Sequence, residues 1–97
     1  MHYDVTTTEV FDSWLAGLRD TRAQRALAQG LLKLENGLFG NVASVGDGVS
    51  EYKVDVGAGY RAYFVTRGRT IIVMLCGGDK STQVRDIERA KEMAADL

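Results

Sequence analysis

Basic side chains gather in one stretch of this 97-residue chain, between Ser50 and Lys80. That stretch holds five basic and three acidic residues, a net charge of +2 in a chain whose formal charge is −1. Lysine and arginine form charge-assisted hydrogen bonds with phosphate oxygens, and the arginine fork can form two in parallel. The stretch therefore indicates a site for an anion such as phosphate. The five bases are Lys53, Arg61, Arg67, Arg69 and Lys80.

Alternating residue types predict that some of these bases lie on a β-hairpin. Polar and apolar residues alternate over residues 50–56 and again over 60–66, with a glycine-rich break at 57–59. A three-residue loop at the break brings the apolar residues of both strands to one face, whereas a two-residue loop would mix charges into that face. The three-residue loop is therefore the expected one, and it pairs Val56 with Tyr60.

The opposite face of the hairpin then carries polar side chains. Lys53 is expected opposite Tyr63, and Asp55 opposite Arg61, with each pair in side-chain reach. One interpretation is an exposed, solvated sheet face with cross-strand ion pairs. The other is an anion site that Lys80 completes, because a helix is predicted to begin beside it and the free N–H groups of a helix start favour phosphate.

The residues by themselves indicate an anion site, and cleavage of RNA without a metal is the reaction that the family resemblance of this chain implies for it. The 2′-hydroxyl attacks the phosphate, so the reaction needs a base, a cation for the crowded phosphorane and an acid for the leaving oxygen. Arg61 is the best candidate for the cation because its charge is permanent and forked, and Lys80 is the second. Tyr63 would stack on a base or move a proton, and Lys53 or Glu51 would act as the base.

Other polar residues are candidates for contacts with substrate. Arg67 and Arg69 flank a glycine in a predicted turn and, like Glu51, are expected to bind substrate. Gln83 would cap the last helix or bind a base edge. Asp86 would pair with a nearby cation or touch substrate.

Composition excludes several other classes of protein. One cysteine allows no internal disulfide, and one histidine with one cysteine excludes the usual structural zinc sets, so no metal or cofactor is expected. The longest apolar run, 71–76, is too short to span a membrane, and no secretory signal is visible. The charge of −1 rules out binding nucleic acid by bulk charge alone. We expect one cytoplasmic domain over residues 1–97.

The elements that would position these residues form an α+β domain. Their predicted order is β-α-α-β-β-β-α, with an N-terminal helical hairpin and a C-terminal helix packed on a small, mainly antiparallel sheet. Residues 38–48 are expected to be a loop, and glycines at 77–78 to end the last strand. The expected elements are a strand at 3–6, helices capped by Thr6 and Asp20 with a stop at 36–37, strands at 50–56, 60–66 and 70–76, and a helix from Ser81.

The motifs of the chain resemble those of the RelE/ParE superfamily of toxins, in the HigB-like branch of addiction module killer proteins. The resemblance covers nearly the whole chain in unbroken order, and segments 57–64 and 77–83 are together its most specific part. The family usually has arginine where this chain has Lys53, which keeps the charge but loses the fork. The matching segments are residues 11–15, 18–20, 51–53, 57–64, 77–83 and 86–87.

This resemblance implies the toxin of a type II toxin–antitoxin system with a RelE-like fold. Many relatives cut mRNA on the ribosome and are neutralised by a partner. The expected function is therefore a ribosome-associated, metal-independent mRNA endoribonuclease. Its expected partners are the ribosome, mRNA and a cognate antitoxin of the helix-turn-helix kind. The alternative is a non-catalytic toxin that binds a protein target, as some ParE-type relatives do, or an inactive relative that acts as a binding module.

Overall fold

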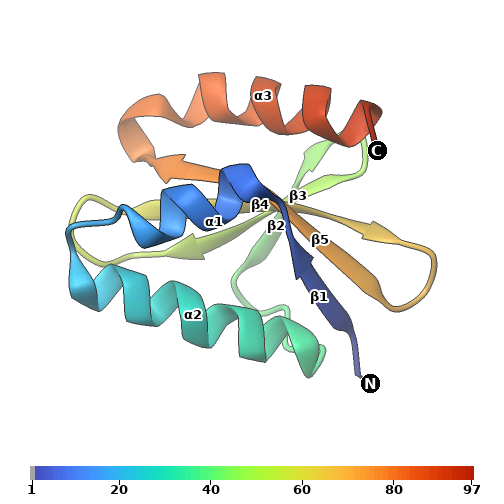
Figure 1. Cartoon of the computed structure of the whole chain (residues 1–97), viewed down its shortest axis with the longest axis horizontal. Coiled ribbons are helices and arrows are strands. Elements are labelled where there is room, and N and C mark those ends of the chain that lie inside the picture. Colours follow the sequence, from blue (N-terminus) through green and yellow to red (C-terminus); the bar gives the residue numbers. More distant parts are fainter. Residues whose placement is uncertain (1) are drawn as a thin grey trace.

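A five-stranded sheet with helices on both faces organises the computed structural model, which describes residues 2–97 (Figure 1). The strand order is β1-β5-β4-β3-β2, and every neighbouring pair is antiparallel except β1 with β5. The predicted α+β class is confirmed, with one strand more than expected. The elements are β1 (Asp4–Thr7), α1 (Glu9–Ala16), α2 (Thr21–Glu35), β2 (Val42–Gly46), β3 (Val49–Val54), β4 (Tyr60–Arg67), β5 (Ile71–Asp79), the 3-10 helix η1 (Lys80–Thr82) and α3 (Gln83–Ala95).

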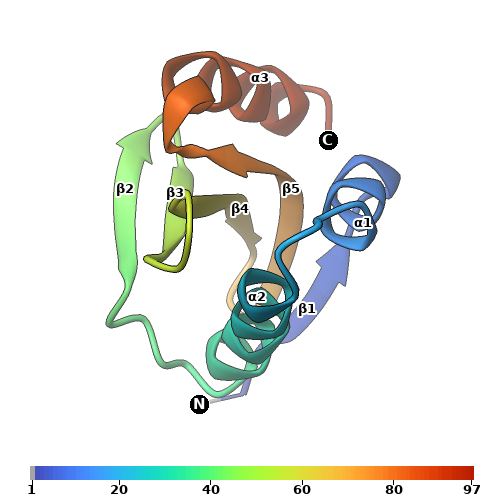
Figure 2. The same cartoon turned by 90° about the vertical axis from the view of Figure 1, so that its left-hand side faces the viewer.

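Two separate cores lie on the two faces of the sheet. Helices α1 and α2 cover one face and α3 covers the other (Figure 2). On the first face Phe11 and Leu27 pack against Phe64 and Met74, and on the second Ala90 packs near Val65 and Leu75. Strand residues alternate between the faces, so each strand contributes to both cores. No helix among residues 2–97 is long and apolar enough to cross a membrane.

The structure confirms one of the two predicted helix caps and corrects the other. Thr8 caps α1, since its Oγ1 accepts a hydrogen bond from the N–H of Phe11 at 3.1 Å. The prediction of Thr6 was wrong, because parallel pairing with β5 continues to Thr7 and delays the helix. The predicted cap of α2 is confirmed, with Asp20 Oδ1 accepting from the N–H groups of Arg22 and Ala23.

Strand β2 lies where a loop was expected. Residues 42–46 pair with β3, although the ladder shifts between Ser44 and Gly46. The segment is short and contains small residues, so its own pattern of alternation is weak. Pairing with β3, a long-range contact, makes it a strand, and the prediction of a loop over 38–48 was wrong.

The glycines at 77–78 continue β5 where a break was predicted. A Cβ on Gly77 would collide with the ring of Trp14 from α1, and one on Gly78 would collide with the carboxylate of Asp86 from α3. The two glycines therefore mark the close approach of a helix on each face of the strand. They do not mark a turn, and β5 ends only at Asp79.

The β3–β4 hairpin has a longer loop than predicted. Lys53 pairs with Arg61 and Glu51 pairs with Tyr63, which is a shift of two residues along one strand. The loop is residues 55–59, and its two glycines both have positive φ, 57° at 57 and 78° at 59. A three-residue loop usually has one such residue. Because the shift is even, the faces were predicted correctly and the backbone pairs were not. Asp55 nevertheless lies in side-chain reach of Arg61, as predicted.

Candidate functional site

Polar side chains replace the apolar core beneath the N-terminal half of α3. On this face of the sheet, Arg61 is 6 % exposed, Glu51 is 5 % exposed and Tyr63 is fully buried. The interpretation of a solvated face with cross-strand ion pairs holds for Lys53 and Asp55, which are exposed. It was wrong for the three buried side chains, because α3 packs on this part of the face. The same strands are apolar further along, at Val49 and Val65.

Arg61 is buried with part of its hydrogen-bonding capacity unused. Its Nη1 donates to the carbonyl of Tyr60 at 3.3 Å and lies 3.9 Å from Oδ1 of Asp55. Its Nε is buried and has no partner in the described part of the chain. A buried donor without a partner costs about 1–3 kcal/mol, so a ligand that accepts from this edge would be favoured.

Lys80 meets Arg61 at the hairpin loop. A Cβ on Gly59 would lie 3.4 Å from Cδ of Lys80 and 3.7 Å from Nη1 of Arg61. The backbone N–H of Lys80 also donates to the carbonyl of Gly59 at 2.9 Å, which ties the end of β5 to the loop. The structure thus brings two predicted site residues together around Gly59, where a larger side chain would come between them.

The start of the C-terminal helical segment is already occupied by a carboxylate. Oδ1 of Asp79 accepts from the N–H of Ser81 at 2.8 Å and from its hydroxyl at 2.5 Å. These hydrogen bonds hold the pKa of Asp79 below its usual value. The prediction that free N–H groups beside Lys80 would receive phosphate was therefore wrong. A phosphate here would depend on the two cationic side chains.

Two buried acids near Arg61 bind neutral partners. Nε2 of Gln83 donates to Oε2 of Glu51 at 3.0 Å, and the Thr82 hydroxyl donates to Oδ2 of Asp86 at 2.5 Å. No side chain among residues 2–97 caps α3, so the expectation that Gln83 would cap it was wrong. The sequence showed neither contact, although a glycine in a strand does signal close approach, here of the Asp86 carboxylate.

Tyr63 differs most from its expected setting. Its hydroxyl is buried without a hydrogen-bond partner among residues 2–97, and its ring is not exposed. Burial, followed by the nearby carboxylate of Glu51, raises the pKa of Tyr63 well above its ordinary value. In this conformation the ring cannot stack on a nucleobase, and the hydroxyl would not ionise near neutral pH.

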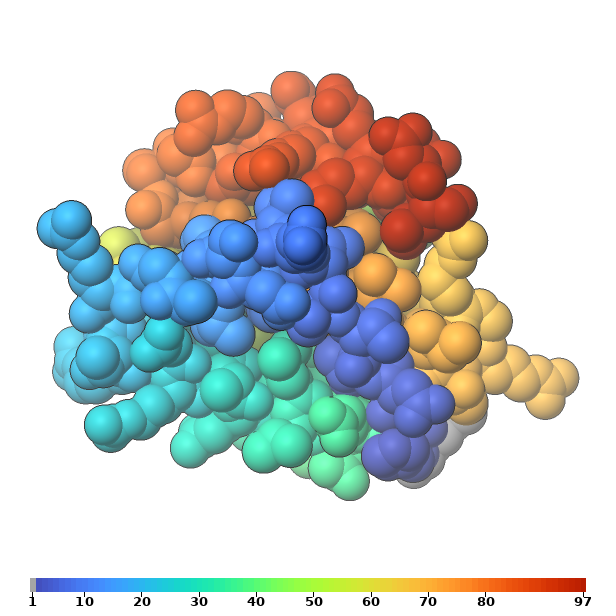
Figure 3. Space-filling model, in the orientation of Figure 1, coloured from blue at the N-terminus to red at the C-terminus, as the bar shows by residue number. Residues whose placement is uncertain are grey.

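The remaining predicted residues are spread along the molecule. Lys53 lies directly across from Arg61 and is exposed. Arg67 is the last residue of β4, about 20 Å from Arg61 at the rise of an extended strand, and Arg69 lies in the turn that follows. That turn projects from the edge of the molecule (Figure 3). The structure therefore separates this pair from the Arg61–Lys80 site.

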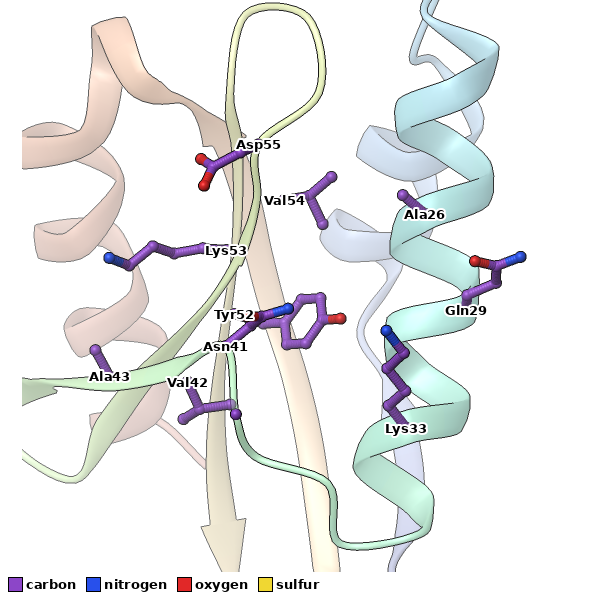
Figure 4. Close-up of a pocket in the computed structure, with 11 residues that line it drawn as sticks. Ala26, Gln29, Lys33, Asn41, Val42, Ala43, Tyr52, Lys53, Val54 and Asp55 are labelled. Carbon is purple, nitrogen blue, oxygen red and sulfur yellow. The ribbon is translucent and has the colours of Figure 1, made fainter.

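A hollow of about 440 Å³ lies between α2 and β3 (Figure 4). Tyr52 and Val54 point toward α2 on this side, whereas Lys53 and Asp55 point to the other face of the sheet (Figure 4). Lys33 of α2 is the cation whose side chain lies along this hollow. Arg61 and Lys80 are not among its lining residues, although Lys53 and Asp55 at its edge are neighbours of Arg61.

The chain has a relative among known proteins that matches it over its whole length. No family model matches it. An uncharacterised protein of Haemophilus influenzae is 42% identical over 97 residues, which is 100% of this chain and 98% of that protein. The chain belongs to the family of that protein. The relative is not assigned an activity, so the function of this chain has to be argued from its fold and its candidate site.

Solved structures show which fold this family has. The chain is similar to a mutant of the Escherichia coli toxin RelE in the free state, with a TM-score of 0.70 and 16% identity over 92% of this chain and 98% of that one. It is also similar to the toxin–antitoxin complex RelBE2 of Mycobacterium tuberculosis, with a TM-score of 0.65 and 18% identity over 82% of this chain and 100% of that one. The predicted RelE-like fold is confirmed, and the HigB-like branch remains a prediction.

Proposed function

We propose that the chain is the toxin of a type II toxin–antitoxin pair and an endoribonuclease that cuts mRNA on the ribosome without a metal. The observation that carries the proposal is the meeting of Arg61 and Lys80 at Gly59, on a RelE-like fold. Arg61 has a buried Nε free to donate, and Lys80 is exposed at the same place. Two cations that meet at one glycine suit a phosphate group.

The arrangement supports a division of roles during cleavage. A phosphate between the two cations would have its developing charge stabilised as the 2′-hydroxyl attacks and the 5′ oxygen leaves. Lys53, exposed and directly across from Arg61, is the candidate for proton transfer that solvent and RNA can reach. Glu51 is buried and bonded to Gln83, which makes it a poorer base than the sequence suggests. Tyr63 would support the site from beneath without touching the RNA.

Dependence on the ribosome follows from the charge. A chain of net charge −1 has few phosphate contacts with which to hold free RNA, and binding by such contacts weakens steeply with salt. The ribosome would present the mRNA at high effective concentration. In this role the protein works in the cytoplasm, and an antitoxin that covers the Arg61–Lys80 site neutralises it. The RelBE2 complex supports such a partner by analogy of fold.

Expression in bacteria without the antitoxin tests the proposal. We expect growth arrest, with cuts within mRNA that is being translated, mapped by sequencing RNA ends. Purified protein should cut naked RNA poorly at physiological salt. Growth that continues normally with folded protein present would contradict the toxin role, and efficient cutting of naked RNA would contradict ribosome dependence.

A second function is favoured by the shortage of proton-transfer groups at the site. Tyr63 is buried with a raised pKa. His2 precedes β1, which pairs with the beginning of β5 and so lies at the far end of that strand from Lys80. These observations suit a toxin that blocks a protein target without catalysis. Growth arrest with intact mRNA would support this second function.

A further inference from the structure

Three carboxylates surround Arg61, and only one of them is paired with it. Asp55, whose side chain is 82% exposed, lies 3.9 Å from Nη1. Glu51 and Asp86 are both buried on the same face of the sheet, yet each accepts a hydrogen bond from a neutral side chain of the η1–α3 segment. A buried arginine with unused donors beside buried acids is an unusual arrangement, because such groups normally pair.

Glu51 is placed to reach Arg61 from the neighbouring strand. It pairs with Tyr63, one step along the ladder from the Lys53–Arg61 pair on the same face. Such diagonal neighbours lie about 7–8 Å apart, within reach of long side chains. A direct Glu51–Arg61 ion pair would form charge-assisted hydrogen bonds, which burial strengthens. It would also occupy the donors that a phosphate needs.

Gln83 holds the carboxylate of Glu51 in its present position. Gln83 is the first residue of α3, and its amide donates to Oε2 of Glu51 at 3.0 Å. We propose that Gln83 is a positioning residue that holds the Glu51 carboxylate away from Arg61 and so keeps the guanidinium open for a phosphate group of the substrate. This inference rests on the proposed function of the Arg61–Lys80 site.

The test compares phosphate binding in the full chain and in Gln83→Leu. Leucine has a similar volume and lacks the donor, so Glu51 is released toward Arg61. The probe is inorganic phosphate, followed by NMR through the Nε–H signal of Arg61. We expect the affinity to fall about tenfold, the equivalent of about 1.4 kcal/mol. Gln24→Leu is the matched control, because Nε2 of Gln24 donates to the carbonyl of Leu15 at 2.9 Å, away from Arg61.

Glu51→Gln distinguishes positioning from a loss of structure. In the Gln83→Leu background it removes the carboxylate that closes the site, so phosphate affinity should return to within about threefold of the wild type. In the wild-type background the same change should have a much smaller effect. The difference between the two backgrounds is the coupling of Glu51 and Gln83.

Each outcome decides between the alternatives. Weak binding in Gln83→Leu, rescued by Glu51→Gln, supports the inference. Unchanged binding in Gln83→Leu, or an equal effect of Glu51→Gln in both backgrounds, overturns it. A lost affinity without rescue also overturns it, because the loss then comes from α3 itself. If the wild type shows no phosphate effect at Arg61, the anion site of the proposed function fails instead.

Discussion

The two faces of the sheet are built from alternate residues of the same strands, yet they hold different cores. The face under α1 and α2 is apolar along its length, from Tyr52 and Phe64 to Ile72. The face under α3 is apolar from Val49 and Val65 to Leu75, and becomes polar and incompletely hydrogen-bonded toward Arg61. The first face stabilises the fold. At the polar end of the second face, buried polar groups without partners lower the stability, and the candidate site lies there.

The largest effect is expected from the apolar face. Phe64→Ala removes a buried ring from the α1–α2 core and should lower the free energy of unfolding by about 3–5 kcal/mol, measured by urea titration. A loss below about 1 kcal/mol would contradict the assignment of stability to this face.

Arg61→Ala should have the opposite profile. Loss of a cation that stabilises a phosphorane should cost about 3 kcal/mol in the transition state, or roughly 100-fold in the rate of mRNA cleavage. Stability should change little, because the variant also removes a buried donor without a partner. Growth arrest and thermal melting are measured in parallel, with Lys80→Ala beside it and the exposed Arg25→Ala of α2 as control. Full toxicity of the Arg61→Ala, Lys80→Ala double variant would contradict the proposed role of these two residues.

Tyr63→Phe sharpens the contrast within the α3 face. The change deletes a buried hydroxyl that has no partner among the described residues, so the free energy of unfolding should rise by about 1 kcal/mol. Toxicity should persist, since the hydroxyl is buried with a raised pKa. A loss of toxicity in a variant that melts at or above the wild-type temperature would show that the hydroxyl acts in cleavage.

The smallest effect is expected at Asp79, at the edge of the site. Its hydrogen bonds from Ser81 lower its pKa in the folded state. The ionised form therefore stabilises the fold above the unfolded pKa of about 3.9, and that contribution is lost as pH falls through the lower folded value. Asp79→Asn should lack this acid-dependent loss. The stability difference between wild type and variant should shrink as pH falls from about 5 to about 2. A constant difference would show that the carboxylate charge contributes nothing.

The sequence predicted which residues form the candidate site better than it predicted what surrounds them. Arg61 and Lys80 were predicted to lie together, and the structure brings them together at Gly59. Their surroundings were not predictable, because they depend on contacts between distant segments. Arg61 is buried by a helix that begins at residue 83, and Glu51 is held by Gln83, 32 residues away. The separation of Arg67 from the site, in contrast, already follows from the predicted strand at 60–66, which β4 matches to within one residue.

Local patterns determined the parts of the fold that repeat every few residues. Helical spacing and the Asp20 cap defined α2, and alternation assigned Tyr52 and Arg61 to opposite faces, because these depend only on backbone periodicity. Tertiary structure decided the rest. It made a strand of residues 42–46 by pairing them with β3, and it extended β5 through two glycines that admit a helix on each face. It also covered the polar face with α3, since long-range packing, which no local pattern records, selects which face is buried.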